Sequence, residues 1–168
     1  MNFMKLKYII LLVFTMGLFA SCDPNDTMDT PKTEILGAGQ MLPGEWWVTY
    51  TVDGADIYGV GYTMLSTYNN ADNASNKLFI TDNENFWSFK VEADADINAN
   101  TFSITDGTEL LYDDATTITN GKVIPGGGTT KGGNVTDSIY MEIVWASEPG
   151  TTYVASGVRR TGFLEDEY

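Results

Sequence analysis

An all-β protein with an antiparallel up-and-down barrel of about eight strands is the fold class that the sequence predicts. Three observations support it. Short segments alternate apolar and polar residues, turns rich in Gly, Asn, Asp and Thr separate them, and no helical apolar repeat continues after residue 21. Consecutive hairpin-linked strands favour an antiparallel sheet, and closing it removes exposed edges. A two-sheet sandwich is the alternative.

The first strand is predicted over residues 44–52. Trp46, Val48 and Tyr50 alternate with polar residues or with Trp47, so one face of this strand is bulky and apolar. A second strand is predicted over residues 57–68, with Tyr58, Tyr62 and Met64 on its inner face. Gly59 and Gly61 would allow this strand to bend sharply at a barrel corner.

The remaining strands follow as hairpins. Trp87 and Phe89 face inward in a strand that pairs across residues 82–85, and Met141 and Trp145 face inward near the end of the chain. The predicted strands are residues 77–81, 86–92, 101–105, 109–112, 115–123, 137–146 and 151–164. The Gly-rich segment 125–133 is expected to be a long mobile loop, free to act as a lid.

Composition and length place one folded domain in residues 44–168. The chain has 168 residues, of which 43% are hydrophobic and 12% aromatic, enough apolar material for a core. The charged fraction is 19% without a long run of one sign. We expect a monomer.

Residues 1–21 have the pattern of a signal peptide. Lys5 and Lys7 precede the apolar run 8–20, which is too short to span a membrane. The run ends in Leu-Phe-Ala-Ser followed by Cys22, the only cysteine, and this resembles the lipobox of bacterial lipoproteins. The resemblance implies cleavage before Cys22 and acylation of that residue. An ordinary secretory signal with a free thiol is the alternative.

Residues 22–43 are predicted to be an acidic flexible tether, because Pro24, Pro31 and several aspartates interrupt any periodicity. An acidic stretch directly after the cysteine resembles the surface-export signals of Bacteroidetes lipoproteins. This resemblance implies a lipid-anchored protein of the outer membrane, on the cell-surface or the periplasmic side, with the surface favoured. A solvated linker that carries no localisation signal fits the same residues.

Charge and residue types exclude several functions. The net charge is −14, and the basic residues are scattered, which excludes nucleic acid as a partner. Without histidine, and with Cys22 assigned to lipidation, neither a Ser-His-Asp or Cys-His catalytic set nor a His-ligated zinc site can form. We predict a binding protein with no catalytic residues, metal or cofactor. Residues 94–100 only faintly resemble a calcium loop and are predicted to form a β-turn loop.

Two further resemblances concern the barrel. Gly44-Glu45-Trp46 resembles the G-x-W of lipocalins and other calycins, whose tryptophan closes the barrel floor under an arginine from near the last strand; Arg159 or Arg160 would supply it here. The segments G-E-W-W-V, W-S-F-K-V and G-V-R-R-T-G-F, in this order, are similar to the Bacteroidetes family of lipid-binding putative hydrolases. This resemblance covers residues from about Gly44 to the end and implies a calycin-like barrel.

The expected function is binding of a lipid or other apolar small molecule inside the barrel, in a cavity opening away from Trp46. The predicted ligand-binding residues form the inner face: Trp46, Tyr50, Tyr58, Tyr62, Met64, Trp87, Phe89, Met141 and Trp145. A core filled by these side chains is the alternative. An exposed Trp47 would instead favour a surface module that binds glycan or an outer-membrane protein partner, as an accessory part of an envelope complex.

Overall fold

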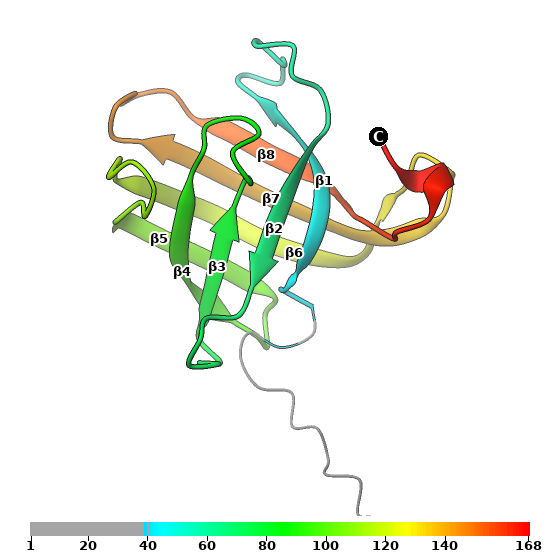
Figure 1. The fold of residues 1–168 in the computed structure, drawn as a ribbon, viewed down its shortest axis with the longest axis horizontal. Coiled ribbons are helices and arrows are strands. Elements are labelled where there is room, and N and C mark those ends of the chain that lie inside the picture. The colour runs from blue at the N-terminus through cyan, green and yellow to red at the C-terminus, as the bar shows by residue number, and fades with distance from the viewer. Residues whose placement is uncertain (1–38, 40) are drawn as a thin grey trace, which may run out of the picture. The chain divides into compact units, whose positions relative to one another are not determined.

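The computed structural model describes residue 39 and residues 41–168, which form a closed barrel of eight antiparallel strands (Figure 1). Each strand pairs with its neighbours in sequence, and the last pairs with the first. The elements are β1 (Gly44–Thr51), β2 (Thr63–Tyr68), β3 (Lys77–Thr81), β4 (Lys90–Asp96), β5 (Thr101–Gly107), β6 (Thr116–Thr129), β7 (Val135–Trp145), β8 (Tyr153–Arg159) and the 3-10 helix η1 (Leu164–Asp166). The predicted barrel is confirmed, and the sandwich is excluded.

The amino-terminal predictions fall outside this part of the chain. The signal peptide, Cys22 and nearly all of the tether lie outside the described residues. Leu42, which we assigned to the tether, is fully buried in the core. Contacts within residues 35–168 form one compact unit, and its described part holds all eight strands and the hydrophobic core. No helix among the described residues is long and apolar enough to cross a membrane.

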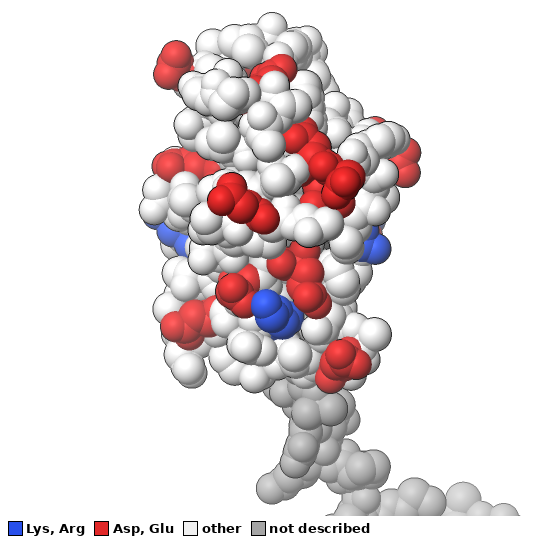
Figure 2. Space-filling view, turned by 90° about the vertical axis from the view of Figure 1, so that its left-hand side faces the viewer, with Lys and Arg blue, Asp and Glu red and all other residues white. Residues whose placement is uncertain are grey.

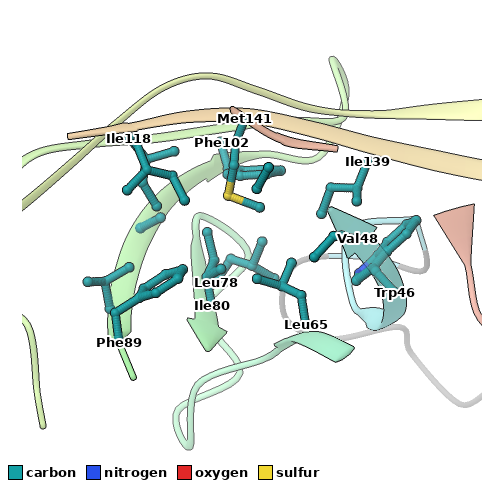
Figure 3. Close-up of a cluster of buried hydrophobic side chains, with 14 of the residues drawn as sticks. Trp46, Val48, Leu65, Leu78, Ile80, Phe89, Phe102, Ile118, Ile139 and Met141 are labelled. Atoms are coloured by element: carbon teal, nitrogen blue, oxygen red, sulfur yellow. The ribbon is translucent and has the colours of Figure 1, made fainter. Parts of the chain in front are cut away.

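The interior of the barrel is filled with side chains. Trp46 and Val48 of β1, Leu65 of β2 and Met141 of β7 are all fully buried, and Figure 3 shows Trp46 at one side of this cluster of inward-pointing side chains. Burial of one such side chain contributes about 1.5–3 kcal/mol, and together these residues provide the main driving force for closing the barrel.

The second strand begins six residues later than the alternation predicts, and its faces are reversed. Leu65 and Thr67 point inward, whereas Met64 is only partly buried. The reason lies before the strand, where the Asp56 carboxylate accepts hydrogen bonds from the backbone of Gly59 (2.8 Å) and Gly61 (2.8 Å). Both glycines have positive φ, +66° and +72°, so they form a turn instead of a bent strand.

Two other strand boundaries also differ. The β4 strand starts at Lys90, since residues 86–89 form a turn around a buried carboxylate, and residues 109–112 form a turn in place of a strand. In both segments the alternation of apolar residues is present, but side-chain acceptors take the backbone N–H groups that a strand would use for pairing.

The Gly-rich segment is not a mobile lid. Most of it belongs to β6, which pairs with β7 through Gly128 and Thr129 after a bulge, and the Asp137 carboxylate accepts a hydrogen bond from the Gly126 N–H (2.9 Å). The hairpin tip is fixed to η1, because buried Asp166 accepts hydrogen bonds from the Thr130 hydroxyl (2.5 Å) and the Gly132 N–H (3.1 Å). This tip lies where β8 finishes, at the same end of the barrel as Trp46.

The up-and-down order gives the barrel two different ends. Residues 69–76, 97–100 and 130–134 connect strands at the Trp46 end. Residues 52–62, 82–89, 108–115 and 146–152 connect them at the opposite end, which we call the mouth. In Figure 1 the connection between β1 and β2 and that between β3 and β4 lie at the top.

Candidate functional site

The Trp46 end of the barrel is closed by a fixed set of contacts. Arg159 lies over the Trp46 ring, with its guanidinium carbon 4.2 Å from the ring centroid. The Trp46 indole N–H donates to the Thr67 hydroxyl (2.9 Å), which donates to the Leu42 carbonyl (2.6 Å). A Cβ at Gly44 would lie 2.3 Å from an Arg159 nitrogen, so this position leaves room for the guanidinium. This end therefore offers no entrance for a ligand.

The structure also distinguishes the two arginines. Arg159 forms an ion pair with Asp137 (3.0 Å) and donates to the carbonyls of Pro43 (2.8 Å) and Met41. Arg160 lies on the outer side and pairs with Glu45 and Glu167, each at 2.8 Å. Adjacent residues of a strand point to opposite faces, so only Arg159 can reach Trp46.

The mouth is lined by aromatic side chains in mutual contact, which we call the mouth cluster. Phe86 stacks on Tyr50 with ring centroids 4.3 Å apart, and Trp87 stacks on Trp145 at 5.2 Å. Tyr153 contacts Trp145 edge to face at 4.7 Å. The members are Tyr50, Tyr58, Phe86, Trp87, Phe89, Trp145 and Tyr153.

Two pockets open in the mouth and share Trp87. One has a volume of about 240 Å³ and is lined by Tyr58, Val60, Phe86 and Trp87, all apolar or aromatic. The other, of about 120 Å³, is lined by Trp87, Ser88, Phe89, Glu109, Tyr112, Asp114 and Trp145. Around them Ile57, Leu110 and Tyr112 are more than half exposed. An apolar surface with a few polar groups is typical of a small-molecule site.

The buried carboxylate of Asp82 holds the loop that carries Phe86 and Trp87. It accepts hydrogen bonds from five backbone N–H groups at 2.9–3.1 Å, those of Glu84, Phe86, Trp87, Ser88 and Phe89. Charged acceptors form stronger hydrogen bonds than neutral ones. This carboxylate thus fixes the aromatic rings of the mouth through the backbone.

Two further carboxylates fix the neighbouring loops. Glu109, also buried, accepts from the backbone of Lys90 (2.7 Å), Leu111 (2.8 Å) and Tyr112. Asp56 organises the loop that carries Tyr58, and the backbone N–H of Gly61, more than those of its neighbours, lowers the pKa of its carboxyl. All three acidic side chains support the walls of the mouth as acceptors of backbone hydrogen bonds.

Two buried polar atoms of the mouth cluster have no hydrogen-bond partner among the described residues: the Tyr50 hydroxyl and the Trp145 indole N–H. Burial, together with the charge of Asp82, raises the pKa of Tyr50, so its hydroxyl stays neutral. Burial and the hydrogen bond to Glu148 likewise raise the pKa of Tyr153. An unpaired buried donor costs about 1–3 kcal/mol, which a polar atom of a ligand or a water molecule could recover.

A second hollow lies on the outer surface over β1 and β2. It has a volume of about 520 Å³ and is shallow, and we call it the outer groove. Its walls are Glu45, Trp47, Tyr62, Thr63, Met64, Ser66, Asn83 and Asn85. Tyr168 covers part of it, stacking on Tyr62 at 3.8 Å and contacting Trp47 edge to face at 6.0 Å.

The structure divides the nine predicted ligand-binding residues among three places. Trp46 and Met141 lie in the packed interior. Tyr62 and Met64 line the outer groove, because β2 has the reversed phase described above. The mouth brings together the other five, Tyr50, Tyr58, Trp87, Phe89 and Trp145.

Sequence reasoning missed Phe86, Tyr153 and Asp82. A strand over residues 86–92 would have turned Phe86 away from Trp87, whereas the turn around Asp82 lets both rings face the mouth. The turns in which Asp56, Asp82 and Glu109 accept backbone hydrogen bonds become evident only in the three-dimensional structure. No group of three or more His, Cys, Asp or Glu in the described chain is arranged to hold a metal ion.

A closed barrel of eight antiparallel strands that each pair with their neighbours in sequence defines the class of small up-and-down β-barrel proteins. Residues 33–164 match the family model described as lipid-binding putative hydrolase, and the chain belongs to this family. No curated protein matches the chain.

Proposed function

We propose that this protein binds a lipid or other apolar small molecule at the mouth of its barrel. The observation that carries the proposal is the pair of pockets that meet at Trp87, next to a filled interior. The lipid-binding family supports the class of ligand. An elongated chain would lie across the mouth cluster, in contact with Trp87 and Tyr58.

The expected affinity is modest. Burying about 200 Å² of ligand at about 25 cal/mol per Å² yields roughly 5 kcal/mol before the cost of immobilising the ligand. This value corresponds to a Kd of about 0.2 mM, so tighter binding requires a larger buried area or polar contacts, for example with the unpartnered Trp145 N–H.

Replacing Trp87 with alanine should weaken binding of an apolar probe by about tenfold or more, because the residue forms a wall of both pockets. We would titrate residues 35–168 with the uncharged fluorophore N-phenyl-1-naphthylamine and extract the purified protein with solvent for mass spectrometry. Trp47→Ala, on the outer surface, is the matched control and should bind as the wild type does. Unchanged binding by Trp87→Ala would exclude the mouth as the site.

The hydrolase part of the family description is not carried into the proposal. The chain has no histidine to act as a base for a serine nucleophile, and Asp82 and Glu109 are occupied by backbone N–H groups. These carboxylates have a structural role in the mouth.

We further propose that the protein is a lipoprotein of the outer membrane, anchored through acylated Cys22, with the cell surface as the favoured side. The proposal is supported by the sequence pattern of residues 1–22 and by the acidic stretch that follows. Each buried methylene of an acyl chain contributes about 0.8 kcal/mol to membrane attachment.

Labelling cells with a fatty-acid analogue should mark the wild type and leave Cys22→Ala unmarked. Protease treatment of intact cells then separates the cell surface, where the chain is degraded, from the periplasm, where it is protected. Equal labelling of both forms would contradict lipidation at this residue.

Binding of a saccharide in the outer groove is a second candidate function. Trp47 and Tyr62, which Tyr168 covers in part, supply aromatic rings, and Asn83, Asn85 and Ser66 supply the uncharged polar groups that sugar hydroxyls bind. Affinity electrophoresis through gels containing soluble polysaccharides distinguishes the two functions, since retardation by this site would be lost in Trp47→Ala and kept in Trp87→Ala.

A further inference from the structure

The charged groups that line the mouth pockets are acidic. Glu109 and Asp114 line the smaller pocket, and Glu148 accepts a hydrogen bond from the Tyr153 hydroxyl of the mouth cluster (2.6 Å). Asp82 lies directly behind Phe86 and Trp87. A negative charge entering this site would meet carboxylates in a partly dehydrated environment, where like charges repel more strongly than in water.

Among the described residues, no basic side chain lines either pocket of the mouth, and each has its partner elsewhere. Lys77 pairs with Asp94 at the Trp46 end (2.6 Å), and Lys90 extends over the outer-face ring of Phe79 (5.2 Å). The remaining four are Lys122 over Tyr140, Lys131 over Tyr168, Arg159 over Trp46 and Arg160 beside Glu45. Figure 2 shows the same imbalance on one face of the molecule, where acidic side chains are spread widely and basic ones are few.

A head group at the mouth therefore finds neutral donors and anionic acceptors. Trp145 lines the smaller pocket, and its buried indole N–H, which has no partner among the described residues, would donate to a hydroxyl or carbonyl oxygen that enters beside it. A hydroxyl or ammonium group can donate to Asp114, whose oxygens already accept from Ser147 (2.6 and 3.0 Å) but retain further lone pairs. A carboxylate or phosphate has no cation to pair with here.

We propose that the mouth selects lipids without negative charge, with an uncharged or cationic head group, and rejects fatty-acid anions and anionic phospholipids. This inference rests on the proposed function and adds the class of ligand. It names Asp114 as a residue that sets specificity through its charge.

Three amphiphiles with the same chain test the proposal: decanol, decylammonium and decanoate. Each would compete at neutral pH with N-phenyl-1-naphthylamine bound to residues 35–168. Decanoate should bind about tenfold more weakly than decanol, a factor equal to about 1.4 kcal/mol. Decylammonium should bind at least as tightly as decanol, and added salt should reduce the difference between decanoate and decanol.

Asp114→Asn keeps the shape of the side chain and one acceptor oxygen but removes its charge, so it should strengthen decanoate binding relative to decanol binding by about threefold. Asp72→Asn removes one charge at the opposite end and is the matched control, expected to leave all three affinities unchanged. Thermal unfolding followed by circular dichroism establishes that both variants are folded. The salt dependence of the wild type tests the charge effect without any substitution.

Decanoate binding as tight as decanol binding would overturn the inference and leave the proposed function standing. Failure of the probe and of all three amphiphiles to bind would overturn the proposed function and this inference with it.

Discussion

Replacing Trp46 with alanine should lower the free energy of unfolding by about 3–5 kcal/mol, which makes it one of the two most damaging single changes we predict. The indole is fully buried, lies under Arg159 and donates to Thr67 at 2.9 Å. Its removal leaves a large cavity at the closed end and deprives the guanidinium of its ring, a contact that contributes about 1 kcal/mol.

Urea unfolding of residues 35–168, followed by far-ultraviolet circular dichroism, measures this effect. Trp47→Ala removes the same side chain from the next position of β1, where it lies on the outer face in contact with Tyr168. We expect a loss of about 1 kcal/mol from that control. Equal losses for the two variants would mean that the closed end does not hold the barrel together.

Asp82→Asn should cost about 2–4 kcal/mol, because five backbone N–H groups point at a carboxylate that the amide cannot replace. The amide has one acceptor oxygen, and its NH₂ group would face backbone donors. The loop that carries Phe86 and Trp87 would lose its fixed shape, so binding of the apolar probe should weaken together with stability.

Asp96→Asn is the control for this substitution. The Asp96 carboxylate accepts two backbone hydrogen bonds, from Asn98 (2.9 Å) and Ala99 (3.1 Å), in an exposed turn at the Trp46 end. Its replacement should cost less than about 1 kcal/mol and leave probe binding unchanged. If Asp82→Asn also has so small an effect, the carboxylate does not organise the mouth.

The mouth and the closed end have opposite properties because different parts of the sequence form them. At the closed end, Arg159 pairs with Asp137 and donates hydrogen bonds to two backbone carbonyls, so its positive charge stabilises the closure of the barrel. At the mouth, acidic residues serve as acceptors for the loops, and no described cation balances them. An uncharged apolar ligand suits such an entrance better than an anion does.

The sequence favoured a barrel over a sandwich, and the G-x-W resemblance implied that Trp46 lies at one end. By itself the sequence determined the all-β class and the inward face of β1, because a strand with one buried face must place every second residue inside. Residues 77–81 of β3 were also predicted with the observed bounds for this reason. The family follows from the order of short motifs, and the match over residues 33–164 agrees with it.

Only the tertiary structure decided which arginine covers Trp46, the phase of β2, the path of the Gly-rich segment and the membership of the mouth cluster. Each depends on a partner that is distant in sequence or on a side chain that captures backbone N–H groups. Thr67 is buried because it bonds Trp46 and Leu42, and Asp56 and Asp82 turn apolar segments into loops. Alternation indicates only which face of a sheet is buried. It carries no information on the long-range bonds of Thr67 or on the local bonds by which Asp56 and Asp82 capture backbone N–H groups.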